Sequence, residues 1–91
     1  MAAWSVYLLE CVDHSLYCGV TTNLDTRLLK HNQGTASRYT RARRPVTLAA
    51  VRDNLEKSAA FKLEYRIKQL PAARKIAALN GQEIGADISA S

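Results

Sequence analysis

The sequence predicts an α+β domain in which helices pack on a small three-stranded sheet, antiparallel or mixed. Two apolar segments rich in β-branched and aromatic residues, 4–11 and 16–20, stand close together and indicate paired strands. A third such segment follows at 46–51, and two segments with helical spacing of apolar residues come after it. The expected order is strand, strand, helix, strand, helix, helix, and a sheet of only three strands needs such helices for stability.

The first two strands are expected to form an antiparallel hairpin, because the polar residues 13–15 suit a tight turn. Directly opposed residues of such a pair share a face of the sheet. An odd number of connecting residues therefore places Tyr7 and Tyr17 on one face, and an even number without a bulge places them on opposite faces. Gly19 lies inside the second strand and predicts a bulge, or a point where another backbone or a ligand comes close.

A helix is expected over residues 24–32. The polar residues 21–23 are good N-cap types, and Gly34 can adopt the left-handed conformation just after the end of a helix. Residues 35–45 have no apolar periodicity and contain four arginines, so they are expected to form a basic loop.

The C-terminal part of the chain predicts two helices. Apolar residues recur at helical spacing in the first, which Ser58 is expected to cap and Pro71 to end. A short second helix is expected over residues 72–79. The tail 82–91 has little to bury and is expected to be frayed, so a single domain is expected over residues 1–81.

Composition indicates an ordered globular protein. The 91 residues are 47% hydrophobic and 23% charged, which excludes disorder as the main state. No apolar run is long enough to span a bilayer, and the first basic residue, Arg27, comes too late for a signal peptide, so a cytoplasmic protein without membrane contact is expected. Cys11 and Cys18 are too few for a disulfide scaffold, and their spacing fits no zinc cluster.

The positive charge is concentrated in one stretch of the chain. The net charge is +5, and residues 24–44 contain six basic residues against the single acidic residue Asp25, while the remaining basic and acidic residues cancel. A concentrated positive patch attracts a polyanion, and nucleic acid is the commonest one. A solvated loop with several arginines is the alternative.

Five side chains are candidates for chemistry. Arg27 and His31 are four residues apart, so they project from one face of their helix, although such pairs are often surface residues without a function. Glu64 falls on the apolar stripe of its helix, where a carboxylate needs a cation, hydrogen bonds or a metal; the alternatives are a Glu paired with an arginine or one at the edge of the stripe. The strand residues Tyr7 and Tyr17 could equally be ordinary packing residues.

Together the order and spacing of these residues are similar to the motifs of a known family. Tyr7 lies in the segment SVY and Tyr17 in YCG, and these are followed by Arg27, His31 and then the helical Glu64. In this arrangement the chain resembles the GIY-YIG nuclease domain, specifically its small stand-alone bacterial branch, over about residues 4–80.

The resemblance implies a metal-dependent endonuclease that hydrolyses phosphodiester bonds in DNA, with RNA as an alternative substrate. It implies that Glu64 holds one Mg²⁺ or Mn²⁺ ion and that Arg27 binds a phosphate oxygen. Tyr17 would position or deprotonate the attacking water, with Tyr7 and His31 in support, and the identity of the general base stays open. Gly19 would let the substrate backbone approach the hairpin.

The basic loop is expected to follow the phosphates without reading the sequence, and its aromatic residue is expected to stack on a base. The residues concerned are Arg38, Tyr39, Arg41, Arg43 and Arg44. Low sequence specificity is therefore expected, with no small-molecule cofactor and with the oligomeric state left open. Two alternatives remain: a catalytically weak or inactive nucleic-acid-binding module of the same fold, and a protein-interaction domain whose basic loop meets an acidic partner.

Overall fold

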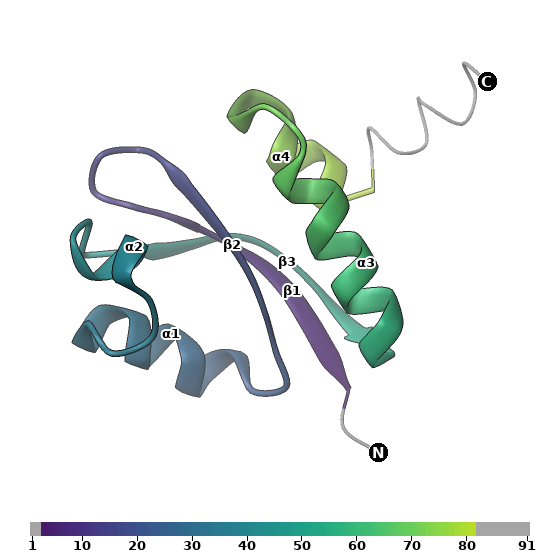
Figure 1. Cartoon of the computed structure of the whole chain (residues 1–91), viewed down its shortest axis with the longest axis horizontal. Coiled ribbons are helices and arrows are strands. Elements are labelled where there is room, and N and C mark those ends of the chain that lie inside the picture. The colour runs from purple at the N-terminus through teal and green to yellow at the C-terminus, as the bar shows by residue number, and fades with distance from the viewer. Residues whose placement is uncertain (1–2, 82–91) are drawn as a thin grey trace.

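The α+β class is confirmed by the computed structural model, which describes residues 3–81 (Figure 1). The frayed tail expected at 82–91 lies outside the described residues. The elements in chain order are β1 (Trp4–Glu10), β2 (Leu16–Thr21), α1 (Leu24–Gln33), α2 (Arg38–Arg41), β3 (Thr47–Leu55), α3 (Lys57–Lys68) and α4 (Ala72–Leu79). The three strands form one antiparallel sheet in the order β2-β1-β3. Among the described residues, no helix is both long and apolar enough to cross a membrane.

The sheet lies between two groups of helices (Figure 1). Val6 and Leu8 of the central strand β1 are fully buried on the face that α3 and α4 cover. Tyr7 and Leu9 alternate with them and point to the opposite face, where Leu24 and Leu28 of α1 pack. Burial on both faces explains why β1 is an almost continuous apolar run.

The hairpin register places both tyrosines on one face. Tyr7 lies opposite Gly19 and Leu9 lies opposite Tyr17, and the connection, residues 11–15, has an odd number of residues. Of the two alternatives for the hairpin, the one with an odd number of connecting residues is therefore correct. Tyr17 stands beside Tyr7 on the face that α1 covers, with the two ring centroids 6.5 Å apart.

Helix α1 begins and ends at the expected signals. The side chain of Asn23 accepts a hydrogen bond from the backbone N–H of Thr26, and Gly34 adopts the left-handed conformation with a φ of 83°. Near the end of the helix, the amide of Asn32 accepts a hydrogen bond from Val46 N at 2.8 Å and donates one to Val46 O at 3.1 Å. Asn32 thereby ties α1 to the segment that leads into β3.

A continuous loop was expected over residues 35–45. The structure differs, because this segment contains the short helix α2. Ser37 is its N-cap, accepting a hydrogen bond from Thr40 N, and Thr40 is fully buried. A helix of one turn is too short to show periodicity, which is why the pattern of apolar residues missed it.

Two further boundaries differ from the expectation. Ser58 does not cap α3 but lies inside it, because the helix starts at Lys57 with Glu56 as its N-cap and no side-chain capping bond. Strand β3 continues beyond residue 51 to Leu55, because Leu55 pairs with Trp4 at the start of β1.

Candidate functional site

A chain of buried polar groups lies between β1, α1 and α2. The Tyr7 hydroxyl is 2.9 Å from His31 Nε2, and His31 Nδ1 is 2.7 Å from Thr40 Oγ1. The three residues are at most 2% exposed. Each element contributes one of them, so the position of α2 decides how the His31 ring is held.

The protonation of this chain follows from its surroundings. Burial raises the pKa of Tyr7 well above its usual range, so its hydroxyl keeps the proton. Burial, and then the charge of Arg27, lower the pKa of His31, so the ring is neutral at neutral pH. If Nδ1–H donates to Thr40, then Tyr7 donates to Nε2 and Thr40 can donate to the carbonyl of Ser37, 3.4 Å away. In the other tautomer, the proton is on Nε2, and the Tyr7 hydroxyl then has no acceptor among residues 3–81. The tautomer with the proton on Nδ1 is therefore favoured.

Tyr17 is the outer member of an aromatic cluster. Its ring centroid is 5.1 Å from that of His31 and 6.0 Å from that of Tyr39. Unlike Tyr7, it is only half-buried. Tyr17 is therefore the phenol of the pair that a bound molecule can reach.

Arg27 lies one turn before His31 on α1 and is half-buried. Its positive charge lowers the pKa values of both Tyr7 and His31, which places it close to both groups. Within the described part of the chain, no hydrogen bond or ion pair engages its guanidinium. A planar cation that is held in place and unpaired in this way suits an oxygen anion such as phosphate.

Glu64 lies at the edge of the apolar stripe of α3, one of the alternatives that the sequence left open. Its side chain is 17% exposed, and Oε2 forms an ion pair at 3.0 Å with Lys68 Nζ rather than with an arginine. Its negative charge contributes to raising the pKa values of Tyr7 and Cys18, so the carboxylate lies near the middle of the hairpin. Lys68 is 52% exposed, so this ion pair is open to solvent.

A divalent ion is compatible with these residues. Residues 3–81 contain no group of three or more His, Cys, Asp or Glu side chains that could hold a metal ion. Mg²⁺ needs no such cage, because one or two carboxylates together with water and substrate phosphate satisfy it. Lys68 occupies one oxygen of Glu64, and no described residue engages the other. The site thus offers one carboxylate ligand, for which Lys68 competes.

The group that lies close to Gly19 is a side chain of the same protein, and not the other backbone or ligand that was expected. A Cβ at this position would lie 2.5 Å from the Tyr7 hydroxyl oxygen and 2.6 Å from its Cζ. The expected approach of substrate backbone at Gly19 is therefore wrong on this face, because the Tyr7 ring fills the space. The glycine lets Tyr7 cross β2 and reach His31.

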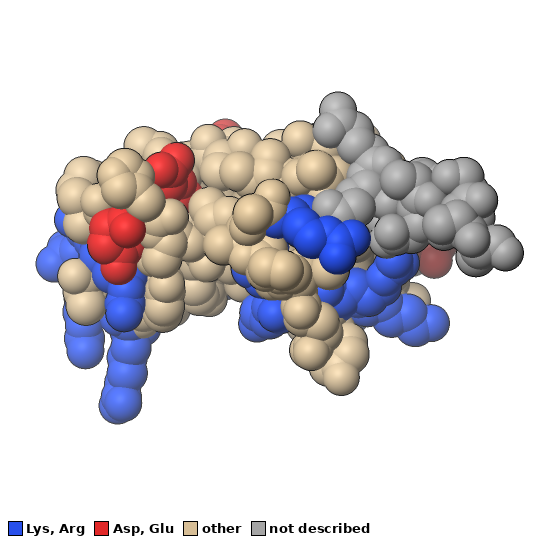
Figure 2. Space-filling model, turned by 90° about the horizontal axis from the view of Figure 1, so that it is seen from above, with Lys and Arg blue, Asp and Glu red and all other residues tan. Residues whose placement is uncertain are grey.

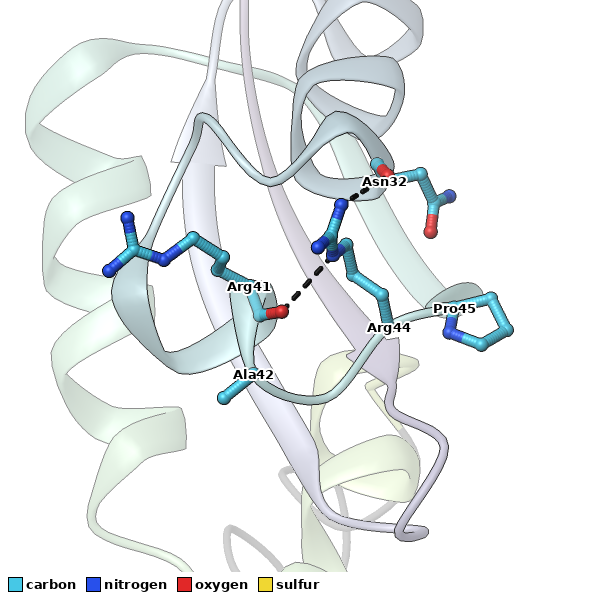
Figure 3. A pocket seen from close by; sticks show the side chains of 5 residues that line it. All are labelled: Asn32, Arg41, Ala42, Arg44 and Pro45. Atoms are coloured by element: carbon cyan, nitrogen blue, oxygen red, sulfur yellow. Dashed lines mark hydrogen bonds between the residues drawn. The ribbon is translucent and has the colours of Figure 1, made fainter.

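The basic loop divides into engaged and free side chains. The Arg43 guanidinium lies 3.9 Å from the centroid of the Tyr39 ring and donates to Asp13 at 3.1 Å. Arg44 donates to the carbonyl groups of Arg41 and Asn32, beside a shallow pocket of about 460 Å³ (Figure 3). These contacts give Arg43 and Arg44 a structural role, and the Arg43 guanidinium lies over one face of the Tyr39 ring, which is still 36% exposed.

Arg38 and Arg41 remain available to a polyanion. Both are exposed, and no ion pair engages either guanidinium within residues 3–81. In Figure 3 the Arg41 side chain points away from Arg44. Of the residues expected to bind phosphates, these two fit that role best.

Sequence reasoning missed two residues that shape the site, Thr40 and Lys68. Thr40 fixes the His31 ring, and its signal is the N-cap residue Ser37 three positions earlier, which predicts a helical turn. Lys68 stands four residues after Glu64, the spacing at which oppositely charged side chains meet on a helix.

The buried His31 predicts a specific loss of stability in mild acid. Its pKa is lowered in the folded state, so below about pH 6.5 the unfolded state binds more protons and the free energy of unfolding decreases. We expect His31→Gln to flatten this decrease between about pH 7.5 and pH 5.5, as measured by urea unfolding. His14→Gln is the control, because the His14 side chain is 86% exposed. Equal slopes for wild type and His31→Gln would contradict the assignment.

The chain matches the GIY-YIG catalytic domain over residues 3–77. It is 46% identical over 76 residues to a UPF0213 protein of Nitratidesulfovibrio vulgaris, covering 84% of this chain and 69% of that protein. It is also 46% identical over 78 residues to a UPF0213 protein of Oceanobacillus iheyensis, covering 86% of this chain and 91% of that protein.

Two solved structures are similar. The solution structure of the E. faecalis protein EF2693 has a TM-score of 0.63 and 32% identity, and the match covers 92% of this chain and 90% of that one. The solution structure of a Bacillus halodurans UPF0213 protein has a TM-score of 0.51 and 41% identity, covering 80% of this chain and 78% of that one. The chain therefore belongs to the GIY-YIG family, in its branch of small stand-alone bacterial proteins.

Proposed function

We propose that this protein is a metal-dependent endonuclease that hydrolyses phosphodiester bonds in DNA, or in RNA, with low sequence specificity. One observation carries the proposal: the guanidinium of Arg27 has no partner within the described part of the chain and lies beside the buried Tyr7–His31 pair. Membership of the GIY-YIG family supports a nucleic-acid substrate. Arg27 would bind a non-bridging phosphate oxygen and stabilise the charge that develops there.

The two phenols have different roles in this proposal. Tyr7 keeps its proton and donates a hydrogen bond to His31 Nε2, so it acts as a positioning residue. Tyr17, half-buried beside it, contacts the attacking water. Glu64 would hold a Mg²⁺ or Mn²⁺ ion, which supplies charge stabilisation at the phosphoryl group and the leaving oxygen.

The exposed arginines of α2 would bind the substrate strand. Arg38 and Arg41 would contact phosphates along the strand, and such contacts position nucleic acid without reading its sequence. We therefore expect cleavage rates to depend strongly on salt and weakly on base sequence.

Nicking of supercoiled plasmid under single-turnover conditions tests the proposal. The wild type is expected to nick DNA with Mg²⁺ or Mn²⁺ and not with EDTA, and Arg27→Ala to lower the rate by about 10²–10³-fold. Arg27→Lys is expected to recover only part of the rate, because an ammonium lacks the planar fork. Lys30→Ala, an exposed cation of the same helix, is the matched control.

Two results would contradict an endonuclease. Salt-sensitive binding of nucleic acid without metal-dependent cleavage by the wild type would indicate an inactive binding module. Neither binding nor cleavage would indicate a protein-interaction domain.

A further inference from the structure

Two aromatic rings stand exposed on the outer surface of α3. Phe61 is 42% exposed and Tyr65 is 68% exposed. They are four residues apart, so they lie on one face of the helix, one turn from each other. The indole of Trp4 in β1 extends this surface, with its ring centroid 5.4 Å from that of Phe61.

Cationic side chains flank these rings. Lys62 and Arg66, together with the two aromatic residues of α3, line a shallow pocket of about 460 Å³. Lys57 Nζ lies 5.9 Å from the centre of the Trp4 ring. We call this surface the α3 patch, and it consists of Trp4, Lys57, Phe61, Lys62, Tyr65 and Arg66.

The ring of Tyr65 is more exposed than that of Tyr39. The Tyr39 ring is covered by the guanidinium of Arg43 at 3.9 Å and packs beside Tyr17. Within residues 3–81, no ring contact, hydrogen bond or ion pair engages Tyr65. Tyr65 therefore offers a larger exposed ring to a ligand than Tyr39 does, at 68% against 36% exposure.

The α3 patch adjoins the candidate site. Tyr65 directly follows Glu64, and consecutive side chains of a helix diverge by about 100°, so the patch begins beside the Glu64 carboxylate. Lys68, the ion-pair partner of Glu64, is electrostatically coupled to Tyr17 in β2, so this side of α3 faces the hairpin. Figure 2 shows Lys and Arg side chains projecting toward the same edge of the molecule at both of its ends.

We propose that the α3 patch is a stacking platform for the unpaired bases of a single nucleic-acid strand, next to the phosphate bound at the candidate site. Exposed aromatic rings between cations are the combination that binds single strands, because every base has a face to stack and every phosphate a charge to pair. A second copy of this chain would bring the same cations into contact and be repelled. The proposal rests on the proposed function and adds to it the class of substrate: strands with unpaired bases.

Equilibrium binding with the metal chelated by EDTA tests the platform separately from catalysis. A labelled oligo-dT or oligo-U strand of about 12 nucleotides and a duplex of equal length serve as probes, with fluorescence anisotropy at fixed salt as the readout. We expect the wild type to bind the strands more tightly than the duplex. Tyr65→Ala and Tyr65→Leu are expected to weaken strand binding by about 5- to 100-fold and to leave duplex binding nearly unchanged.

Matched variants separate stacking from other effects. Tyr65→Phe keeps the ring and is expected to bind the strands as the wild type does. Leu29→Ala removes a side chain that is 58% exposed on α1 and is expected to have no effect. The single tryptophan, Trp4, adds a second readout, because quenching of its fluorescence on strand binding would place the strand at the patch.

Four results would overturn the platform. The first is unchanged strand binding by Tyr65→Leu, and the second is an equal loss for strand and duplex. The third is self-association of the wild type that Tyr65→Ala abolishes, which would make the patch an interface between copies. Displacement of the strand by polyglutamate at equal concentration would indicate an acidic protein partner and would also overturn it. Since no metal is present, a lack of nuclease activity would leave these results interpretable.

Discussion

Glu64→Gln is expected to lower the rate of metal-dependent nicking by at least about 10³-fold. Glutamine has the same shape but no charge, so it removes the one carboxylate at the site that has an oxygen without a partner among the described residues. Bound metal contributes several kcal/mol of charge stabilisation, and each 1.36 kcal/mol is tenfold in rate. The measurement is the single-turnover rate of plasmid nicking against Mg²⁺ or Mn²⁺ concentration.

Lys68→Gln is the matched variant, and it should change the metal dependence in the opposite direction. Lys68 Nζ lies 3.0 Å from Glu64 Oε2, where it competes with a cation for the carboxylate. Its removal is expected to lower the metal concentration that gives half of the maximal rate. Because Lys68 is 52% exposed, the ion pair contributes little to stability, and the variant should remain folded.

If Glu64→Gln keeps a rate within about tenfold of the wild type, Glu64 does not hold the metal.

Local signals were sufficient to predict most of the fold. The run of buried residues in β1, the N-cap at Asn23 and the left-handed Gly34 each depend on neighbours close in sequence. The shared face of Tyr7 and Tyr17 also follows from the length of one turn. Such features need no knowledge of the tertiary structure, because backbone geometry alone determines them.

The contacts that shape the site join distant segments and could not be predicted in this way. His31 and Thr40 meet only because a single helical turn brings Thr40 back onto α1. The Arg43–Asp13 ion pair spans 30 residues and holds Arg43 beside Tyr39, so a residue predicted to contact phosphate is bound within the protein. The sequence indicated that another backbone or a ligand comes close at Gly19, whereas the group that does so is the Tyr7 side chain, 12 residues earlier in the chain.

Gly19→Ala is expected to destabilise the protein by about 1–3 kcal/mol, because the new methyl group overlaps a buried ring. Its Cβ would lie 2.5 Å from the Tyr7 hydroxyl oxygen, and Tyr7 is only 2% exposed. The ring cannot move aside without breaking its 2.9 Å hydrogen bond to His31 Nε2. For a domain of this size, the melting temperature should fall by about 5–20 °C, and nicking should weaken with it because the Tyr7–His31 contact is lost.

A double-mutant cycle tests this reason for the loss. Tyr7→Leu removes the hydroxyl oxygen and Cζ that the new Cβ would meet, so adding Gly19→Ala to Tyr7→Leu should cost much less than adding it to the wild type. The free energies of unfolding of the four proteins, measured in urea, give the coupling directly. Additive losses would show that alanine acts through the backbone of β2 and not through the Tyr7 ring. A large coupling would identify Gly19 as the residue that lets Tyr7 reach His31, and so as a positioning residue of the proposed nuclease.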